Sequence, residues 1–285
     1  MKKSLKKTKN VNWETDYIGF LDTTSVQNTA NTVRTLYKSG TKNRVKKNPK
    51  KFKINSTGFL GANCNSKILF TKNTRAHEFG KIIVEIRLAN TDTLEGQSLL
   101  FDVLCNPNLT DEYVTNSLKR KRDSPYEYRE KINDKIYDEK TSYDSTNKNI
   151  INYAKRQDPN NINKKDEEKR NNLLKNLNTD EIKRVFKNER KLHIVLDNYS
   201  VHHTPLLENI SMILNINLIF LPPYSPDLNP IEDVWDPCKE KTKKGYIIDA
   251  EHLKIIFEDE FYKQVQKTSY TENWLDEYLG INAKS

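Results

Sequence analysis

The sequence predicts an α/β protein built on one mixed sheet, with helices on both faces of the sheet and a helical insertion in the chain. Three observations support this fold class. Short apolar runs separated by turns follow the N-terminal tail and are typical of antiparallel strands. A strand, a helix and another strand follow closely between residues 192 and 221, which is the pattern of a parallel crossover. A long segment of mixed charge and weak helical periodicity separates these two parts.

This pattern divides the chain into four segments. Residues 1–15 form a basic tail, and residues 16–90 form the first half of the predicted domain. Residues 91–190 are predicted to be a helical insertion, and residues 191–285 to be the second half of the domain with its C-terminal helices. An insertion at this place can loop out without disturbing the sheet.

The first half is predicted to be an antiparallel meander followed by a helix. Tyr17–Leu21 is a short apolar run that ends at Asp22 and leads into a loop. Phe52–Leu60 and Ser66–Phe70 supply two more strands. The helix is expected at Thr74–Leu88, because its apolar residues recur at helical spacing.

The insertion is rich in charged residues and asparagine. Helices are expected within it at Pro125–Tyr137 and at Thr179–Phe186, where two acidic residues suit a first helical turn. It carries no recognisable catalytic motif.

The second half contains the parallel crossover. Leu192–Leu196 and Ile216–Leu221 are the predicted strands, and Thr204–Leu214 is the helix between them. Asp197 therefore lies at the carboxyl end of its strand, the edge at which open α/β sheets place their sites. A proline-rich loop then leads to a helix that begins near Asn229.

The C-terminal part, from His252 to Leu279, has the apolar periodicity of helices packed against the sheet.

The charge balance favours a polyanionic partner. The 285 residues include 48 Lys and Arg against 39 Asp and Glu, which gives a net charge of +9. The segment Lys42–Lys53 holds seven basic residues and no acidic one, and such a run suits a phosphate backbone. The predicted DNA-binding residues are Lys42, Arg44, Lys46, Lys47, Lys50, Lys51 and Lys53. A biased genome composition and a solvated loop are the alternative explanations.

Cysteine usage and hydropathy indicate the compartment. The three cysteines lie far apart without a C-x-x-C pair, so neither a disulfide framework nor a zinc ribbon is indicated. No apolar run approaches the 18 residues that a membrane span needs. We expect a soluble, cytoplasmic protein that is associated with the nucleoid or other DNA and has no membrane partner.

Three acidic residues are candidates for metal-dependent chemistry. Asp22 and Asp197 both follow apolar strands, and the proline-rich loop brings Glu232 back toward the same edge of the sheet. Phosphodiester cleavage commonly uses two divalent cations, and Mg²⁺ prefers carboxylate oxygens. The predicted metal ligands and catalytic residues are therefore Asp22, Asp197 and Glu232, with two Mg²⁺ or Mn²⁺ ions as cofactors.

Two stretches resemble the second and third catalytic blocks of Tc/mariner-like transposases and of the related DDE transposases of prokaryotic insertion sequences. They are LDNYSVHH at residues 196–203 and FLPPYSPDLNPIEDVW at residues 220–235. The 34 residues between Asp197 and Glu232 are the spacing that this resemblance implies for the triad. Asp22 matches the first block more weakly, because a short apolar run before an aspartate is common.

The resemblance implies a ribonuclease H-like fold and a DNA transposase. It further implies cleavage and strand transfer at transposon ends, a TA-type target and a homo-oligomer assembled on DNA. No helix-turn-helix precedes the first predicted strand, so we expect a separate recognition module. Asn198, His202 and His203 are expected to be auxiliary residues near DNA.

Each acidic residue also has a structural interpretation. Asn229 could be the N-cap of a helix with Pro230 at its first position and Glu232 at its third. Asp197 could form an Asx turn, and Asp22 could merely open a turn. Two other functions stay open: an inactive, truncated transposase that only binds DNA, and a ribonuclease H-like nuclease without strand transfer.

Overall fold

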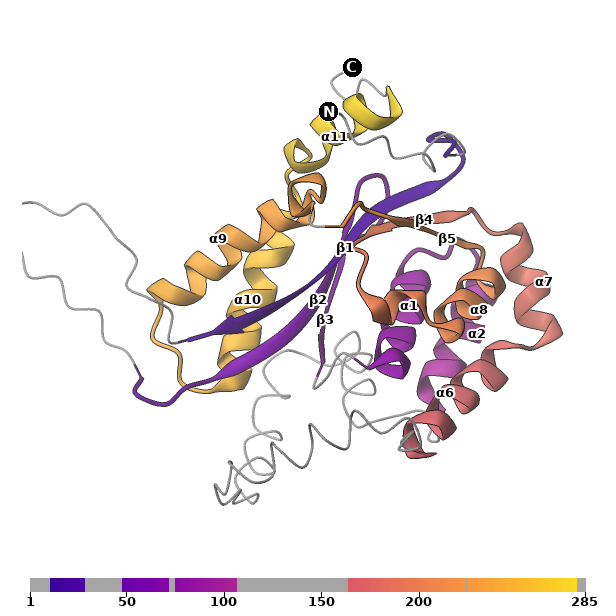
Figure 1. The fold of residues 1–285 in the computed structure, drawn as a ribbon, viewed down its shortest axis with the longest axis horizontal. Helices are drawn as coiled ribbons and strands as arrows, with labels where there is room; N and C mark the ends of the chain where they lie inside the picture. The colour runs from indigo at the N-terminus through magenta and orange to yellow at the C-terminus, as the bar shows by residue number, and fades with distance from the viewer. Residues whose placement is uncertain (1–10, 29–47, 72–74, 107–163, 224, 281–285) are drawn as a thin grey trace, which may run out of the picture.

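Five strands form one mixed sheet in the computed structural model, which describes residues 11–28, 48–71, 75–106, 164–223 and 225–280 (Figure 1). The strand order is β3-β2-β1-β4-β5. β1 pairs antiparallel with β2 and parallel with β4, and β5 continues the parallel half. The strands are β1 (Tyr17–Gln27), β2 (Lys53–Gly61), β3 (Lys67–Thr71), β4 (Leu192–Leu196) and β5 (Ile216–Phe220).

This order confirms the predicted fold class. An antiparallel meander is joined to parallel crossover strands, which is the ribonuclease H-like mixed sheet that the resemblance implied. Because β1 is central, it is the strand that connects the two halves of the chain.

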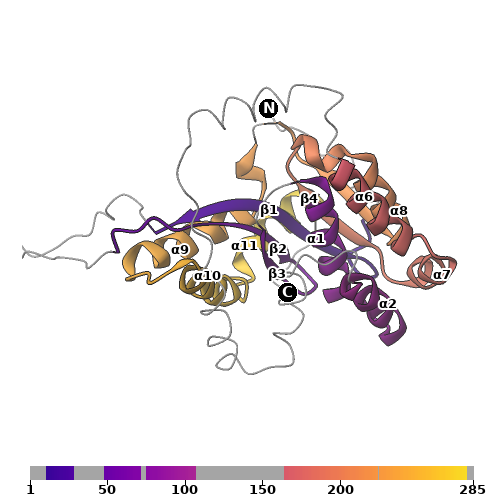
Figure 2. The same cartoon turned by 90° about the horizontal axis from the view of Figure 1, so that it is seen from below.

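Helices cover both faces of the sheet, as the two views agree (Figures 1 and 2). Each face has its own buried apolar cluster. The cluster on one face includes residues of α1 (Ala76–Ala89), α2 (Leu94–Cys105), α6 (Lys164–Leu177), α7 (Asp180–Asn188) and α8 (Pro205–Ile213). The cluster on the other face includes residues of α9 (Ile231–Lys244), α10 (Ala250–Gln264) and α11 (Ser269–Leu279).

β1 is longer than the sequence predicts. The strand was expected to end at Asp22, but it continues to Gln27, because β2 pairs with it as far as the contact between Gln27 and Lys53. Thr24 and Val26 are buried while their neighbours are exposed, which is the alternation of a strand with one covered face. Asp22 therefore lies inside a strand and not in a loop.

Both ends of segment 91–190 pack into the first apolar cluster. Leu100 of α2, Leu177 of α6 and Phe186 of α7 are fully buried there. The helix predicted at Thr179–Phe186 is confirmed as α7, and the Thr179 hydroxyl caps it by accepting a hydrogen bond from the Ile182 amide. The helix expected at Pro125–Tyr137 lies outside the described residues.

Within the parts of the chain that the structure describes, no helix has the combination of length and apolar character that a membrane span requires.

A polar pair, the buried His193 of β4 and the half-buried Asp16 just before β1, joins the amino ends of these two strands. His193 Nε2 lies 2.9 Å from Asp16 Oδ2, and Asn217 donates to His193 Nδ1 at 2.9 Å. Because Nδ1 accepts, the neutral ring carries its proton on Nε2 and donates it to Asp16. Burial is the largest influence on the pKa of His193 and lowers it, although the Asp16 carboxylate opposes this shift.

This pair predicts that acid destabilises the fold. A histidine with a lowered pKa contributes stability above its ordinary pKa near 6.5, and that stability is lost as the pH falls through the lowered value. We expect the free energy of unfolding to decrease between pH 7 and pH 5, and to decrease less in His193→Gln. Urea titrations across this range measure it, and identical pH profiles for the two proteins would contradict the assignment.

Candidate active site

The parallel register of β1 and β4 places two of the predicted residues side by side. Leu21 is the partner of Leu196, so the next residues, Asp22 and Asp197, are neighbours at the edge where β4 ends. Neighbouring strands lie about 4.8 Å apart. The side chains of the preceding pair, Phe20 and Val195, belong to the cluster under α9, so strand alternation directs Asp22 to that same face.

Helix α9 supplies the third predicted residue, Glu232, in its first turn. The predicted N-cap is wrong: α9 begins at Ile231, and its N-cap position is Pro230, which provides no side-chain cap. The side chain of Asn229 serves another purpose. Its amide donates a 3.2 Å hydrogen bond to the Leu21 carbonyl, which ties the start of α9 to β1 directly beside Asp22.

Trp235 connects α9 to Asp22 and was not among the predicted site residues. Its indole Nε1 donates a 2.7 Å hydrogen bond to Asp22 Oδ2. The ring is fully buried and stacks on Phe257 and Phe261 of α10. The tryptophan falls inside the third transposase-like block, but nothing in the sequence indicates that its indole reaches a residue of the first block.

Gly58 makes this arrangement sterically feasible. It is the β2 partner of Asp22, and a Cβ atom there would lie 2.3 Å from Cη2 of Trp235. A glycine inside a strand often marks the close approach of another group, and this is the only signal that the sequence offered for it.

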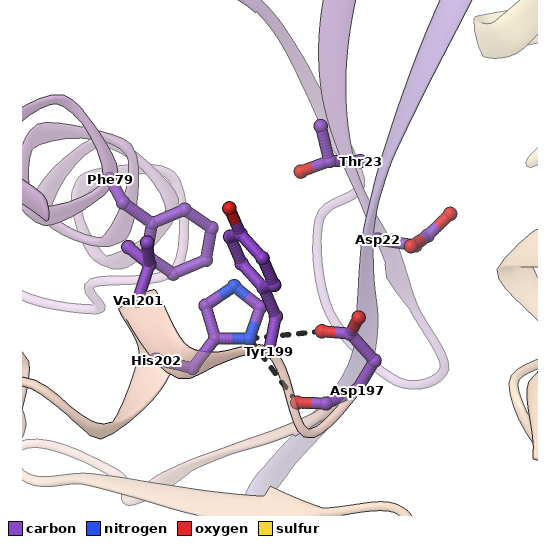
Figure 3. A pocket seen from close by; sticks show the side chains of 7 residues that line it. All are labelled: Asp22, Thr23, Phe79, Asp197, Tyr199, Val201 and His202. Carbon is purple, nitrogen blue, oxygen red and sulfur yellow. Dashed lines mark hydrogen bonds and ion pairs between the residues drawn. The ribbon is translucent and has the colours of Figure 1, made fainter. Parts of the chain in front are cut away.

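Asp197 is held from the other side of the sheet by His202 (Figure 3). His202 Nδ1 lies 3.0 Å from Asp197 Oδ1 and 3.2 Å from the Asp197 carbonyl oxygen. Both partners are acceptors, so Nδ1 must carry the proton. The buried His202 ring packs on Phe79 of α1 with centroids 4.4 Å apart, which fixes its position.

A cavity of about 250 Å³ opens beside Asp22, Asp197 and His202 (Figure 3). Aromatic and apolar side chains form one wall, and the two aspartates and a threonine lie on the other. The lining residues are Asp22, Thr23, Phe79, Asp197, Tyr199, Val201 and His202.

The other two predicted auxiliary residues contact each other. His203 Nε2 is hydrogen-bonded to Asn198 Oδ1, and the His203 ring stacks on Phe220 with centroids 4.2 Å apart. His202 thus contacts an acidic residue of the candidate site directly, whereas Asn198 and His203 form a pair beside it.

The pKa values of Asp22 and Glu232 reflect the closeness of the acidic residues, whereas that of Asp197 reflects its contact with His202. Burial, and then the charge of Asp197, raises the pKa of Asp22, which the Trp235 hydrogen bond partly offsets. Burial, and then the charge of Asp22, raises the pKa of Glu232. The hydrogen bond from His202 is the main reason that the pKa of Asp197 is lowered. Like charges have been brought together at this edge of the sheet.

The oxygen atoms at this site are of the type that binds a hard divalent cation. Carboxylate oxygens are the ligands that Mg²⁺ prefers, and the buried Asn229 Oδ1 has no hydrogen-bond partner among the described residues. The three carboxyl groups are not, however, arranged as a complete metal site: no group of three or more His, Cys, Asp or Glu residues in the described ranges could hold a metal ion. The Asp22 and Asp197 carboxylates instead accept hydrogen bonds from Trp235 and His202, on opposite sides of the sheet.

Part of the predicted DNA-binding segment can be located. Lys50, Lys51 and Lys53 are exposed where the chain enters β2. The Asn48 amide donates a 2.9 Å hydrogen bond to the Ile248 carbonyl, which brings this segment close to the lysine-rich last turn of α9. Lys42, Arg44, Lys46 and Lys47 lie outside the described residues.

The sequence also identifies the family. Residues 112–254, just over half of the chain, match the model of the DDE superfamily endonuclease family. The chain belongs to this family. The matched range contains Asp197 and Glu232 but not Asp22, which the fold places beside Asp197.

Individual relatives match over short stretches or at low similarity. A Sinorhizobium fredii protein described as "Uncharacterized protein y4pE/y4sA" is 50% identical over 42 residues, which are 15% of this chain and 29% of that protein. The mariner Mos1 paired end complex with Mg has a TM-score of 0.44 at 11% identity and covers 93% of this chain and 55% of that one. The catalytic domain of Mos1 mariner transposase has a TM-score of 0.38 at 12% identity and covers 92% and 81%.

The chain thus spans less than a third of the curated relative and about half of the larger of these two structures. The family rests on the sequence match, and the fold rests on the strand order described above.

The contact between Gly58 and Trp235 makes a prediction about stability. Gly58→Ala introduces a methyl group where Cη2 of a fully buried ring already lies, and overpacking of this kind costs about 1–3 kcal/mol. Gly245→Ala is the matched control, because the nearest atoms to its added Cβ are 3.9 Å away. Chemical denaturation measures both variants, and equal stabilities would contradict the packing described.

Proposed function

We propose that this chain is the catalytic domain of a transposase that cleaves and joins DNA strands at transposon ends. One observation carries the proposal: Asp22 in β1, Asp197 directly after β4 and Glu232 in α9 lie close together. In addition to burial, the charge of Asp197 raises the pKa of Asp22, and the charges of Asp22 and Asp197 raise the pKa of Glu232. Two of the three lie in the range that matches the DDE superfamily endonuclease family.

In this proposal the three carboxylates hold two divalent ions, Mg²⁺ or Mn²⁺. When bound, such ions supply activation of the attacking oxygen and stabilisation of the leaving oxygen in phosphoryl transfer. The same residues can serve strand cleavage and strand transfer, because both are in-line displacements at a phosphodiester.

The protein's own hydrogen bonds keep the ligands in place. His202 orients the Asp197 carboxylate. Asn229 fixes the start of α9 and with it Glu232, because its side chain is bonded to β1. Asn198 and His203 are proposed to contact DNA beside the site.

The basic segment is proposed to bind the DNA backbone without reading its sequence. Lys53 is five residues from Gly58, the partner of Asp22, which corresponds to about 17 Å along β2. Lys241 and Lys244 are exposed at the end of α9, which begins at the candidate site and leads toward the same segment. Together these lysines form a basic path away from the carboxylates.

The remaining partners follow from the proposed activity. We propose a homo-oligomer assembled on paired transposon ends, a helix-turn-helix module supplied separately, and a DNA-associated place in the cytoplasm. An inactive protein that only binds DNA is the second candidate, because the described carboxylates are not gathered into a metal-binding group. A nuclease without strand transfer is the third.

A cleavage assay distinguishes these functions. With labelled transposon-end DNA and Mg²⁺ or Mn²⁺, we expect Glu232→Gln to lower cleavage by more than about 100-fold, since changes around metal ligands alone can cost that much. Asp233→Asn is the matched control, because the adjacent exposed side chain points about 100° away around the helix. If Glu232→Gln cleaves DNA as well as the wild-type protein does, Glu232 does not belong to the site. If the wild-type protein cleaves no DNA, the inactive DNA-binding protein is favoured. If it cleaves DNA but joins no strands, the nuclease without strand transfer is favoured.

The basic path predicts how DNA affinity depends on salt. Replacing Lys50, Lys51 and Lys53 with Gln should reduce the slope of log affinity against log salt by about 2–3, because each phosphate contact contributes about 0.9. Lys175, Lys183 and Lys187 are exposed on α6 and α7, and the same change there should leave the slope unaltered. Fluorescence anisotropy with duplex DNA measures both triple variants, and equal slopes would contradict the assignment.

A further inference from the structure

We infer that Trp235 is a positioning residue for the candidate metal site, because its indole N–H sets the orientation of the Asp22 carboxylate. The inference rests on the proposed function and deepens it by adding a residue that holds a ligand in place. Trp235 contacts Asp22 through Nε1 at 2.7 Å.

The indole is held rigidly enough to orient another group. It is fully buried and lies between β2 and α10, where it stacks on two phenylalanine rings with centroids 5.7 and 5.8 Å away. On the β2 side, Gly58 leaves space for the six-membered ring. A ring enclosed in this way cannot follow the carboxylate, so the carboxylate must adapt to the ring.

The contact also links two of the three acidic residues. Glu232 and Trp235 are three positions apart in α9 and therefore lie on one side of the helix. Asn229 binds the Leu21 carbonyl and Trp235 binds the Asp22 side chain, so α9 is fixed to two consecutive residues of β1. Two hydrogen bonds, one from Asn229 before Glu232 and one from Trp235 after it, thus set the position of Glu232 relative to Asp22.

The bond leaves Asp22 able to bind a cation. An ionised carboxylate has about four acceptor sites, of which the single indole proton uses one. Neutral N–H donors around a ligand fix its orientation without adding a charge that would repel the cation, as donors around metal ligands commonly do.

A purely structural role for Trp235 makes a different prediction. Buried indole N–H groups usually have a partner, so the bond to Asp22 could serve only the stability of the core. In that case loss of the N–H would lower the unfolding midpoint and leave metal affinity unchanged. The two roles are therefore separated by measuring metal binding and not activity alone.

Trp235→Phe and Trp274→Phe form a matched pair. Both replace a buried tryptophan and remove one indole hydrogen bond, but Trp274 donates to the Leu228 carbonyl at 3.0 Å and not to an acidic residue. With Mn²⁺ alone as the probe, and free Mn²⁺ followed by electron paramagnetic resonance, we expect Trp235→Phe to weaken binding about 10-fold or more. Trp274→Phe should bind as wild type does. Equal affinities for all three proteins would overturn the inference.

A second measurement does not require Trp235→Phe to fold. The chain has three tryptophans, Trp13, Trp235 and Trp274, so indole ¹⁵N labelling gives three resonances. Trp13→Phe and Trp274→Phe identify two of them, and the third belongs to Trp235. In the metal-free protein, Asp22→Ala should move the Trp235 indole proton upfield and leave that of Trp274 in place. An unmoved Trp235 resonance would show that the hydrogen bond does not exist, and the inference would fail.

The same variants separate this inference from the proposed function. If Asp22→Ala abolishes Mn²⁺ binding while Trp235→Phe binds Mn²⁺ as wild type does, only the positioning role is wrong. If Asp22→Ala itself binds Mn²⁺ like wild type, Asp22 is not a ligand, and both the proposed metal site and the role of Trp235 fall.

Discussion

The packing of α9 against the antiparallel strands β1 and β2 is the contact on which the candidate site depends. Trp235 fills the space above Gly58, and its polar edge meets Asp22, so one side chain provides apolar burial and a hydrogen bond to an acidic group. Asn229 adds a second bond to β1 one residue away. Because Glu232 lies between these two anchors, the helix cannot shift along the strand without moving Glu232 relative to Asp22.

The two aspartates are neighbours, but they are held from opposite sides of the sheet. Asp22 is held from the α9 side by Trp235, whereas Asp197 is held from the α1 side by His202, whose ring rests on Phe79. The helices at both ends of segment 91–190 complete the apolar cluster behind Phe79. Residues far from the carboxylates therefore support one wall of the cavity, and the site draws on both apolar clusters.

The charge of the acidic residues explains why the hydrogen bonds from Trp235 and His202 are needed. Three carboxylates at one edge repel one another, and burial adds to the cost of their ionised forms, as the raised pKa values of Asp22 and Glu232 reflect. Donors from Trp235 and His202 offset part of that cost in the protein without a cation. In the proposed function, a divalent ion would take over this role, and the polar groups would keep the ligands oriented.

Local pattern in the sequence was enough for the sheet, for helices α1 and α7, and for the motifs around Asp197 and Glu232, because strand alternation, helical periodicity and motif spacing act over a few residues. It placed Asp22 at a strand end, where polar residues suggest a turn. Only tertiary structure extended β1 to Gln27, since the pairing with β2 supplies backbone hydrogen bonds that local propensity does not encode. Likewise, Asn229 was a good N-cap by itself, but its amide binds Leu21, and Trp235 reaches Asp22 across 213 positions. Such contacts join residues that are far apart in the sequence. They depend on how a helix docks on the sheet, and a short stretch of sequence does not determine that docking.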